Sequence, residues 1–309
     1  MKLTPDSKIL IQGIAEPLAS TYTARMTAYG TKVAAGVSAG QGGQTLDGIP
    51  VFDLVEQAIQ SVGAVDISII FVRPYAALDA ALEAIAAGIR QIILITGGIP
   101  PLDMVRLLRK AEATQTLIVG PSSAGIIVPG KVLLGTHEPE FYSPGSVGLL
   151  SRSGNLTYEV AGEMTRAGYG QSIAVSIGSE PFVGSSVVQW LEILAADKNT
   201  KVIVLVSHIS HTSSSDEQAA AEYIVATLDK PVIVYFVGRL LPQEKLLGPG
   251  NALGFWRQEA MLASPQAELA AEQTPENRKI AAFKQAKIPI AERPSQIPDL
   301  VKKALKKSG

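Results

Sequence analysis

The chain has 309 residues, with 27 Lys or Arg against 28 Asp or Glu, and its formal net charge is -1. This near-neutral balance argues against a basic nucleic-acid-binding surface, and the absence of cysteine excludes disulfides, thiolate catalysis and cysteine-ligated zinc. At about 150 residues per domain, the length predicts two domains that each bury their own core.

Short apolar runs rich in Ile and Val recur through the first half at intervals of roughly 25 residues, the spacing of β-α-β units. Stretches with helical periodicity separate them, most clearly at 78–87 and 102–111. Such a pattern is typical of a parallel sheet covered by helices on both faces. We predict strands at Ile9–Ile11, Val33–Ala35, Ile67–Phe71, Ile92–Ile95 and Leu117–Val119.

A Gly- and Pro-containing stretch at 129–145 interrupts this rhythm, after which the series restarts. We therefore expect an α/β protein with domains at 1–130 and 131–309. The segment 238–254, with its glycines and prolines, is too irregular for an ordinary connection, and such loops often carry function. The second half is predicted to contain strands at Val147–Leu150, Ile173–Val175, Val202–Val206 and Val232–Tyr235, and helices at 214–226, from Pro275 and from Pro298.

The first strand-to-helix turn, residues 12–19, lies where dinucleotide-binding folds place phosphate-binding glycines. Of those glycines only Gly13 is present, since Glu16 and Ala19 occupy the other two positions. Pro17 lacks an N–H group, and Glu16 adds negative charge where an anion would approach. These residues favour a plain turn in which Pro17 opens the helix.

The segment Ser151–Glu159 follows a strand and opens a helix, so its backbone N–H groups and small hydroxyls suit an anion site backed by the helix dipole. The alternative, equally weighted, is that Ser153 is simply an N-cap. Residues 178–186 repeat the arrangement after the next strand. Two helix N-termini are thereby predicted to converge on one anion.

Only three histidines occur, at positions 137, 208 and 211. His208 follows a predicted strand, at the end where parallel sheets place ligands. The surrounding residues 207–216 nevertheless favour a polar loop that leads to a helix cap. A zinc site is disfavoured because His208 and His211 lack a clear third ligand, and a Ser-His-Asp hydrolase because no G-x-S-x-G turn occurs.

Several motifs, in the same order along the chain, resemble the alpha subunit of succinyl-CoA synthetase and related nucleoside-diphosphate-forming CoA ligases. The resemblance runs nearly from end to end. The stretches that carry it are Ala28–Lys32, Gly42–Gly43, Gly48–Phe52, Gly98–Pro100, Leu102–Met104, Gly120–Pro121, Ser151–Gly154 and Leu156–Glu159.

The resemblance implies a Rossmann-like CoA-binding domain followed by a flavodoxin-like domain. It implies a phosphohistidine on a Gly-rich loop, a helix N-terminal phosphate site, and an ATP-grasp beta subunit in a heterodimer or heterotetramer. The implied CoA-binding positions are Gly13, Gln41, Val72, Arg73, Pro74, Thr96 and Gly98. The implied phosphate-binding positions are Ser153, Gly154, Asn155 and Ser179, and Tyr158 is the implied substrate contact.

The sequence departs from the family pattern at the positions that perform the chemistry. The family's phosphohistidine aligns with Pro249, which has no nucleophile, and its orienting glutamate aligns with His208. The CoA phosphate loop aligns with 15–19 and a CoA-binding lysine with Gln41, whereas Arg73 adds a cation in place of an apolar turn. Two further departures are Gly97, where the family has glutamate, and Ser122–Ala124, where it has Asn-Cys-Pro.

These departures predict a weakened or lost CoA site, no tightly bound cofactor and no metal. Three hypotheses stay open: a ligase subunit that uses another phosphoryl route such as His208, a non-catalytic regulatory or structural partner, and an acyl or carbamoyl transferase that uses the Ser153 turn. The absence of a leader pattern at 1–8 and of an apolar run of about 20 residues predicts a cytoplasmic chain without membrane or nucleic-acid partners.

Overall fold

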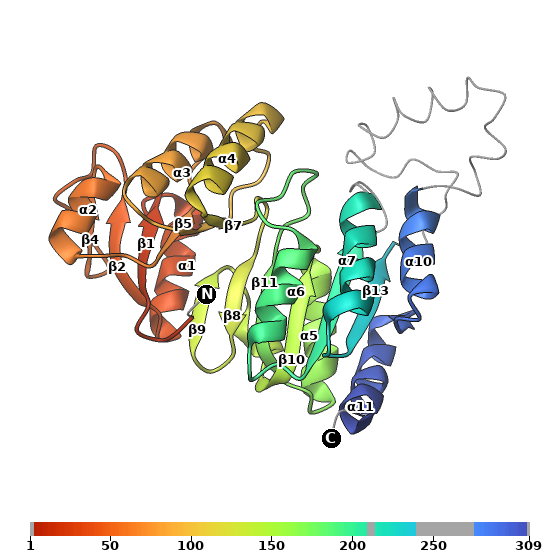
Figure 1. Cartoon of the computed structure of the whole chain (residues 1–309). Coiled ribbons are helices and arrows are strands. Elements are labelled where there is room, and N and C mark those ends of the chain that lie inside the picture. The colour runs from red at the N-terminus through yellow and green to blue at the C-terminus, as the bar shows by residue number, and fades with distance from the viewer. Residues whose placement is uncertain (1–2, 209–213, 239–274, 308–309) are drawn as a thin grey trace.

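The computed structural model describes residues 3–208, 214–238 and 275–307. Figure 1 shows two sheets side by side, the first from red to yellow and the second from yellow-green to blue. Each sheet has seven strands, mostly parallel, which confirms the predicted α/β class. Among the described residues, no helix is both long and apolar enough to cross a bilayer.

The first sheet has the strand order β3-β4-β2-β1-β5-β6-β7, so the chain reverses its winding direction beside β1. Ligands of open α/β sheets bind at the strand ends next to such a reversal. Its strands are β1 (Lys8–Gln12), β2 (Lys32–Val37), β3 (Thr45–Leu46), β4 (Ile49–Phe52), β5 (Ile67–Ile70), β6 (Gln91–Leu94) and β7 (Leu117–Val119). Its helices are α1 (Pro17–Ala28), α2 (Val55–Val62), α3 (Ala77–Ala86) and α4 (Pro101–Thr114).

The second sheet has the order β14-β13-β12-β10-β11-β8-β9, in which β8 is antiparallel to both of its neighbours. Its strands are β8 (Gly125–Val128), β9 (Val132–Gly135), β10 (Pro144–Ser151), β11 (Gln171–Ser176), β12 (Val202–His208), β13 (Val232–Val237) and β14 (Ile290–Ala291). Its helices within the described residues are α5 (Asn155–Arg166), α6 (Val187–Ala196), α7 (Ser214–Thr227), α10 (Pro275–Gln285) and α11 (Ile297–Lys307).

Side-chain alternation along β1 divides the apolar core in two. Leu10 faces α2, α3 and α4, whereas Ile9 and Ile11 face α1 and belong to a cluster that continues into the second sheet. Figure 1 shows α3 and α4 lying side by side over the first sheet. Because one apolar cluster spans both sheets, the two halves pack as a continuous body rather than through a linker.

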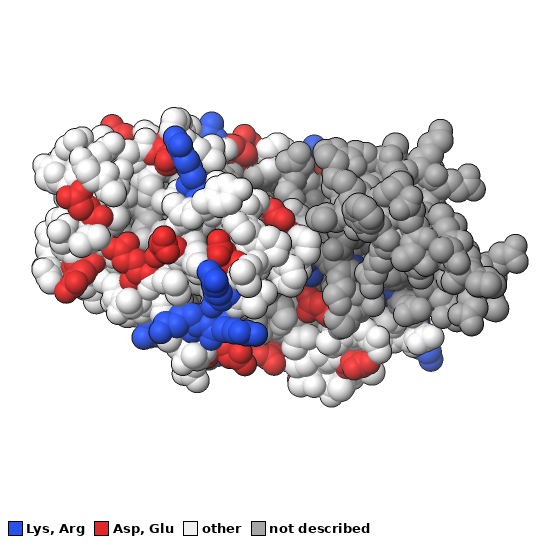
Figure 2. Space-filling model, turned by 90° about the horizontal axis from the view of Figure 1, so that it is seen from above, with Lys and Arg blue, Asp and Glu red and all other residues white. Residues whose placement is uncertain are grey.

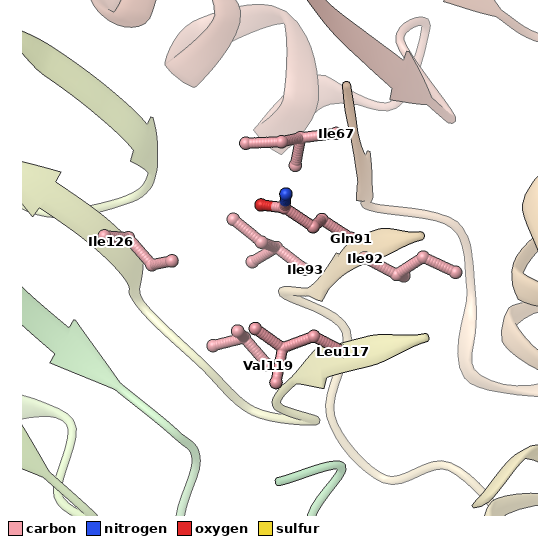
Figure 3. Close-up of a pocket in the computed structure, with 7 residues that line it drawn as sticks. All are labelled: Ile67, Gln91, Ile92, Ile93, Leu117, Val119 and Ile126. Atoms are coloured by element: carbon pink, nitrogen blue, oxygen red, sulfur yellow. The ribbon is translucent and has the colours of Figure 1, made fainter. Parts of the chain in front are cut away.

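Both apolar and polar contacts join the two sheets. Figure 3 shows side chains of β5, β6 and β7 around a small recess that Ile126 of β8 faces from the second sheet. The polar contacts include the Thr31 hydroxyl, 2.7 Å from the Leu133 carbonyl oxygen, and Arg25, whose Nη1 lies 2.7 Å from Glu138 Oε2. Gln91 is the one polar residue among those that line the recess, which suits packing rather than chemistry.

All nine strands predicted from apolar runs are present, and α1 begins at Pro17 as the turn chemistry predicts. The sequence did not predict β3, β4, β8, β9 or β14. The stretch 129–145, read as an interruption, contains β9, whose apolar residues 132–134 pair with β8. The domain limit predicted at residue 130 therefore falls in the turn between two paired strands.

Candidate functional site

The first strand-to-helix turn is tight and satisfies its own backbone. Gly13 has a φ of +81°, and a Cβ there would lie 3.0 Å from the Val72 nitrogen, so this position requires glycine. The Gly13 N–H group donates to the Val37 carbonyl oxygen at 2.8 Å. This N–H group is therefore not directed at a phosphate.

The loop after β2 holds an anion of its own. The N–H groups of Gly40 and Gly42 both donate to Asp53 Oδ1, at 2.7 and 3.0 Å. Gln41, between them, is partly buried, and its own N–H group donates to the Ser38 carbonyl oxygen. Two backbone donors that converge on one oxygen form a small anion site, and here the chain's own carboxylate fills it.

Arg73 brings a cation to the edge of the first sheet. Its side chain is 85% exposed, and its Nε lies 3.9 Å from Glu16 Oε1 across the first turn. Pro74 starts a short 3-10 turn directly after it. Water screens a pair this exposed, so it contributes little stability, but the Glu16 carboxylate offsets the positive charge that Arg73 would offer a phosphate.

The loop after β6 reaches the second domain. The Thr96 hydroxyl donates to the Val72 carbonyl oxygen at 2.6 Å, which ties this loop to the end of β5. The Gly98 N–H group donates to Glu180 Oε1 at 3.1 Å, and the Ser122 hydroxyl donates to the same oxygen at 2.7 Å. Gly98, an expected CoA-binding position, thus contacts the segment 178–186, which was predicted to form an anion site.

The N-terminus of α5 is the best-formed candidate anion site of the second domain. Its N-cap is Gly154, which is exposed, so Ser153 is not the cap. Ser153 is 5% exposed, and its N–H group donates to Ser151 Oγ at 3.0 Å while its carbonyl oxygen contacts the Thr157 hydroxyl. These buried hydroxyls fix the turn and leave the first helical amides without a side-chain cap. The side chain of Asn155 lies outside the description.

Side chains of the protein occupy N–H groups at the N-terminus of α6. Ser179 is exposed in the loop before α6, which begins only at Val187. Ser186 Oγ accepts the Gln189 N–H at 3.1 Å, and Gln189 Oε1 accepts the Ser186 N–H at 2.9 Å, forming a capping box. The Val187 N–H donates to Asp216 Oδ1 at 3.4 Å. As predicted, a second helix starts after the neighbouring strand. Unlike at α5, side chains of the protein already accept hydrogen bonds from N–H groups at its start.

A buried arginine connects the two helix N-termini. Arg152 is 2% exposed, and its Nη1 lies 3.1 Å from Asp216 Oδ2 while its Nη2 donates to the Glu180 carbonyl oxygen at 3.3 Å. Its Nε is buried without a hydrogen-bond partner. Burial raises the pKa of the Asp216 carboxyl, and the positive charge of Arg152 opposes that rise.

His208 ends β12 and pairs in register with Val237 of β13. Its carbonyl oxygen lies 3.5 Å from Nζ of Lys279, which also lies 3.5 Å from Glu217 Oε2. Both charged side chains are fully buried, and the Ser207 hydroxyl donates to Glu217 at 2.9 Å. The backbone of His208 is thus held by a buried ionic network. Pro249 and His211 lie outside the described residues.

Tyr158, the expected substrate contact, is bonded to the backbone just after β9. Its hydroxyl donates to the Thr136 carbonyl oxygen at 3.1 Å, and burial raises its pKa to about 12. The ring of His137, fully buried, stands edge-on to Tyr158 and to Tyr142. Burial lowers the pKa of His137 to about 4, so this histidine is a neutral packing group at pH 7.

The face shown in Figure 2 has acidic and basic side chains interspersed over the described residues, in keeping with the near-zero net charge. Within 3–208, 214–238 and 275–307, no group of three or more His, Asp or Glu side chains is arranged to hold a metal ion. Among these loops, the uncapped N-terminus of α5 suits binding of a phosphate-bearing ligand at backbone amides.

The fold and the site define a two-domain α/β protein of the CoA-binding and CoA-ligase class. A family model described as CoA binding domain matches residues 4–98, and one described as Succinyl-CoA ligase like flavodoxin domain matches 144–246. Both matches confirm the predicted fold class, a Rossmann-like domain followed by a flavodoxin-like one.

The chain belongs to the succinate–CoA ligase alpha-subunit family. It is 40% identical over 247 residues to "Succinate–CoA ligase [ADP-forming] subunit alpha 2" of Archaeoglobus fulgidus, covering 80% of this chain and 84% of that one. It is 38% identical over 248 residues to the ADP-forming subunit alpha of Staphylococcus aureus, covering 80% and 81%.

Solved structures share the fold over nearly the whole chain. ATP citrate lyase of Methanosaeta concilii, in complex with (3S)-citryl-CoA, aligns with a TM-score of 0.81 and 18% identity over 99% of this chain. The chain spans 51% of that protein's length. A dinucleotide-forming acetyl-coenzyme A synthetase of Candidatus Korarchaeum cryptofilum aligns with a TM-score of 0.65 and 21% identity, covering 93% of this chain and 58% of that one.

Sequence reasoning missed three carboxylates that decide the character of the site: Asp53, Glu180 and Asp216. Each accepts a hydrogen bond from a backbone N–H at a candidate binding loop. The sequence analysis considered Asp216 only as part of a polar loop that leads to a helix cap and as the acid of the disfavoured Ser-His-Asp arrangement. The position of Glu180 beside Ser179 carried no local signal of the contact it makes in the other domain.

Proposed function

We propose that this chain is an alpha-type subunit that binds a CoA-class ligand weakly and does not carry the phosphohistidine step of its family. The observation that carries the proposal is the occupation of candidate phosphate-binding amides by the chain's own carboxylates. Asp53 holds the loop after β2, Glu180 the loop after β6, and Asp216 the start of α6. Each carboxylate competes with an incoming anion.

The first-domain edge fits CoA in shape more than in charge. Gly13, Val72 and Thr96 keep the strand-end turns tight, and Arg73 offers one cation. Against this, Glu16 lies near Arg73 and repels the phosphates of CoA. The net expectation is an affinity reduced several-fold for each unfavourable charge, since a partly solvated charge is worth on the order of 1 kcal/mol.

The phosphoryl step is disfavoured on two grounds. Pro249, at the position of the family histidine, has no nucleophilic atom. His208 is the last residue of β12, and its carbonyl oxygen contacts Lys279. A group that must carry a phosphoryl between distant sites needs a mobile segment. We therefore propose a regulatory or structural role beside an ATP-grasp beta subunit, the usual partner of this family, in the cytoplasm.

The phosphoryl question is tested on the full chain, co-purified with its partner. Nucleoside-diphosphate release is measured with CoA and succinate, together and separately, alongside acid-labile phosphate on the chain. We expect no nucleoside-diphosphate release that depends on succinate, and no phosphate attached to the chain. Turnover with a phosphate that disappears in His208→Asn would overturn the proposal in favour of a substitute phosphohistidine.

The binding question is tested by calorimetry with CoA. Arg73→Ala removes the cation and is expected to weaken CoA binding several-fold, whereas Glu16→Gln removes the opposing charge and is expected to strengthen it by a similar factor. Lys110→Ala, at an exposed position of α4, is the matched control. Equal affinities across these variants would contradict CoA binding at this edge.

A further inference from the structure

The Glu180 carboxylate lies where the two domains meet. One of its oxygens, Oε1, accepts the Gly98 N–H at 3.1 Å and the Ser122 hydroxyl at 2.7 Å. Gly98 and Glu180 stand 82 residues apart in the sequence, on the loops after β6 and β11. This is therefore a direct hydrogen bond between a first-domain binding loop and the loop that precedes α6.

The backbone that carries Glu180 is closely fitted. Gly178 has a φ of +94°, and a Cβ there would lie 2.0 Å from the Pro121 carbonyl oxygen, while the Gly184 N–H donates to the Gly120 carbonyl oxygen at 2.7 Å. At Gly97 a Cβ would lie 2.2 Å from Ser122 Oγ. Closely packed segments transmit displacements, so a change of partner at the Glu180 side chain is passed on to the backbone of this loop.

The backbone of Glu180 leads on to the start of α6. Its carbonyl oxygen accepts Nη2 of Arg152 at 3.3 Å, Nη1 of Arg152 lies 3.1 Å from Asp216 Oδ2, and Asp216 Oδ1 accepts the Val187 N–H at 3.4 Å. Arg152 is 2% exposed, and its Nε is buried without a partner. A continuous hydrogen-bonded path therefore joins the Gly98 amide to the first amide of α6.

We propose that Glu180 is a positioning residue that couples ligand binding at the Gly98 loop to anion binding at the start of α6. The proposal rests on the proposed function, in which the first-domain edge accepts a CoA-class ligand. An N–H group makes one strong hydrogen bond, so a ligand oxygen at Gly98 displaces the Glu180 carboxylate. The two discrete states are Glu180 bound to Gly98 and Glu180 released.

Release of Glu180 acts through Arg152. Movement of the Glu180 backbone removes one acceptor from the buried guanidinium, which then shifts with Asp216 and exposes the Val187 amide to an external anion. Ligand and anion are thereby expected to favour each other. Because coupling between two binding sites is reciprocal, the same factor must appear in both directions.

The test measures the affinity of the full chain for inorganic phosphate by calorimetry, with and without saturating CoA. In the unmodified chain we expect CoA to tighten phosphate binding by about fivefold or more. Glu180→Ala removes the carboxylate, so the factor should fall to about 1. Glu180→Gln keeps an oxygen that accepts both hydrogen bonds and should retain the coupling. Glu163→Gln, which removes the same charge from an exposed pair with Arg166, is the control.

Two outcomes overturn the inference while the proposed function stands. In the first, CoA binds the unmodified chain without changing its affinity for phosphate; in the second, Glu180→Ala retains the full factor. Absence of CoA binding to the unmodified chain refutes the proposed function itself and removes the ligand that the coupling requires. Amide hydrogen exchange of residues 95–100 without ligand gives a separate reading: it should rise in Glu180→Ala, and an unchanged rate contradicts the Glu180 contact.

Discussion

The N-termini of α5 and α6 follow neighbouring parallel strands at the same edge of the second sheet, yet they differ in what reaches their first amides. Around Gly154, the N-cap of α5, a Cβ would meet nothing within 4 Å. At α6, Ser186 and Gln189 form a capping box and Asp216 accepts the Val187 N–H. The helix dipole is common to both, so the side chains around each terminus decide whether it can bind an external anion.

The residues that pack against the starts of the two helices also differ in charge. Tyr158 of α5 packs against the neutral ring of His137. The start of α6 contacts Asp216 of α7, whose next residue, Glu217, is paired with the buried Lys279. One terminus therefore rests on uncharged aromatic packing and the other on buried charges, which gives them opposite responses to substitution and to pH.

The largest effect is expected from Lys279→Met. The substitution removes the Lys279 ammonium from the buried pair with Glu217, and breaking a buried ion pair typically costs about 3–5 kcal/mol. Both side chains are 0% exposed, so water does not screen the loss. Urea unfolding of the chain measures it, with Lys284→Met, an exposed position on the same helix, as the control.

Lys279→Met also tests the difference between the N-termini of α5 and α6. Loss of the pair should displace the start of α7 and with it Asp216, so the α6 terminus should lose its internal carboxylate while α5 is unchanged. If Lys279→Met and Lys284→Met unfold at the same urea concentration, the buried network does not support α6.

The second effect concerns His137 and acid. Nε2 lies 3.0 Å from the Gly125 carbonyl oxygen and Nδ1 lies 2.8 Å from the Tyr142 hydroxyl. A carbonyl only accepts, so we assign the proton to Nε2 and the acceptor role to Nδ1. This neutral form is the one that the lowered pKa of about 4, set by burial, maintains at pH 7.

The lowered pKa of His137 makes the native protein less stable in acid. The unfolded chain, with a histidine pKa near 6.5, takes up a proton before the native chain does, so stability is lost as the pH falls from about 7 toward 4. A difference of this size corresponds to about 3 kcal/mol. His137→Gln should unfold without this pH dependence in urea titrations, and an equal slope in both proteins would contradict the assignment.

The third effect, smaller and opposite in sign, concerns Asp216. Burial raises its pKa above 3.8 in the native chain, so the native state holds the proton more tightly than the unfolded state. Its contribution to stability is present at low pH and is lost as the pH rises through the native pKa. Asp216→Asn should lack this loss, which urea unfolding across the acidic range measures.

Asp216→Asn also weakens the occupation of α6. An amide oxygen competes less strongly for the Val187 N–H than a carboxylate does, so phosphate binding should increase several-fold in calorimetry. Asp197→Asn, beyond the opposite end of α6, makes the same change away from the first turn and serves as control. Equal phosphate affinity in both variants would show that Asp216 does not block this terminus.

The sequence predicts the parallel strands well because buried strands are continuous apolar runs, as in residues 202–206 and 232–235. It misses β3, which has only two residues, and the β8–β9 pair, because the turn signal at Pro129–Gly130 was interpreted as a domain boundary rather than a hairpin. The same limit applies to the site. The Ser153–Gly154 turn is local and was predicted, whereas Asp216 meets Val187 from 29 residues away and Glu180 meets Gly98 from 82. Only the packing of helices and domains specifies such contacts.

The smallest effect tests whether closing α5 makes it resemble α6. Gly154→Ser adds a hydroxyl oxygen at the N-cap, where nothing stands in the way of a Cβ, and a serine cap is worth only a few tenths of a kcal/mol over glycine. Stability should therefore rise slightly, while phosphate binding should weaken because the hydroxyl takes one of the free amides. Gly154→Ala fills the same space without an acceptor and should keep its phosphate affinity. Calorimetry on the pair separates occupancy of the amide from bulk, and equal affinities would mean that neighbouring side chains do not govern anion binding at these termini.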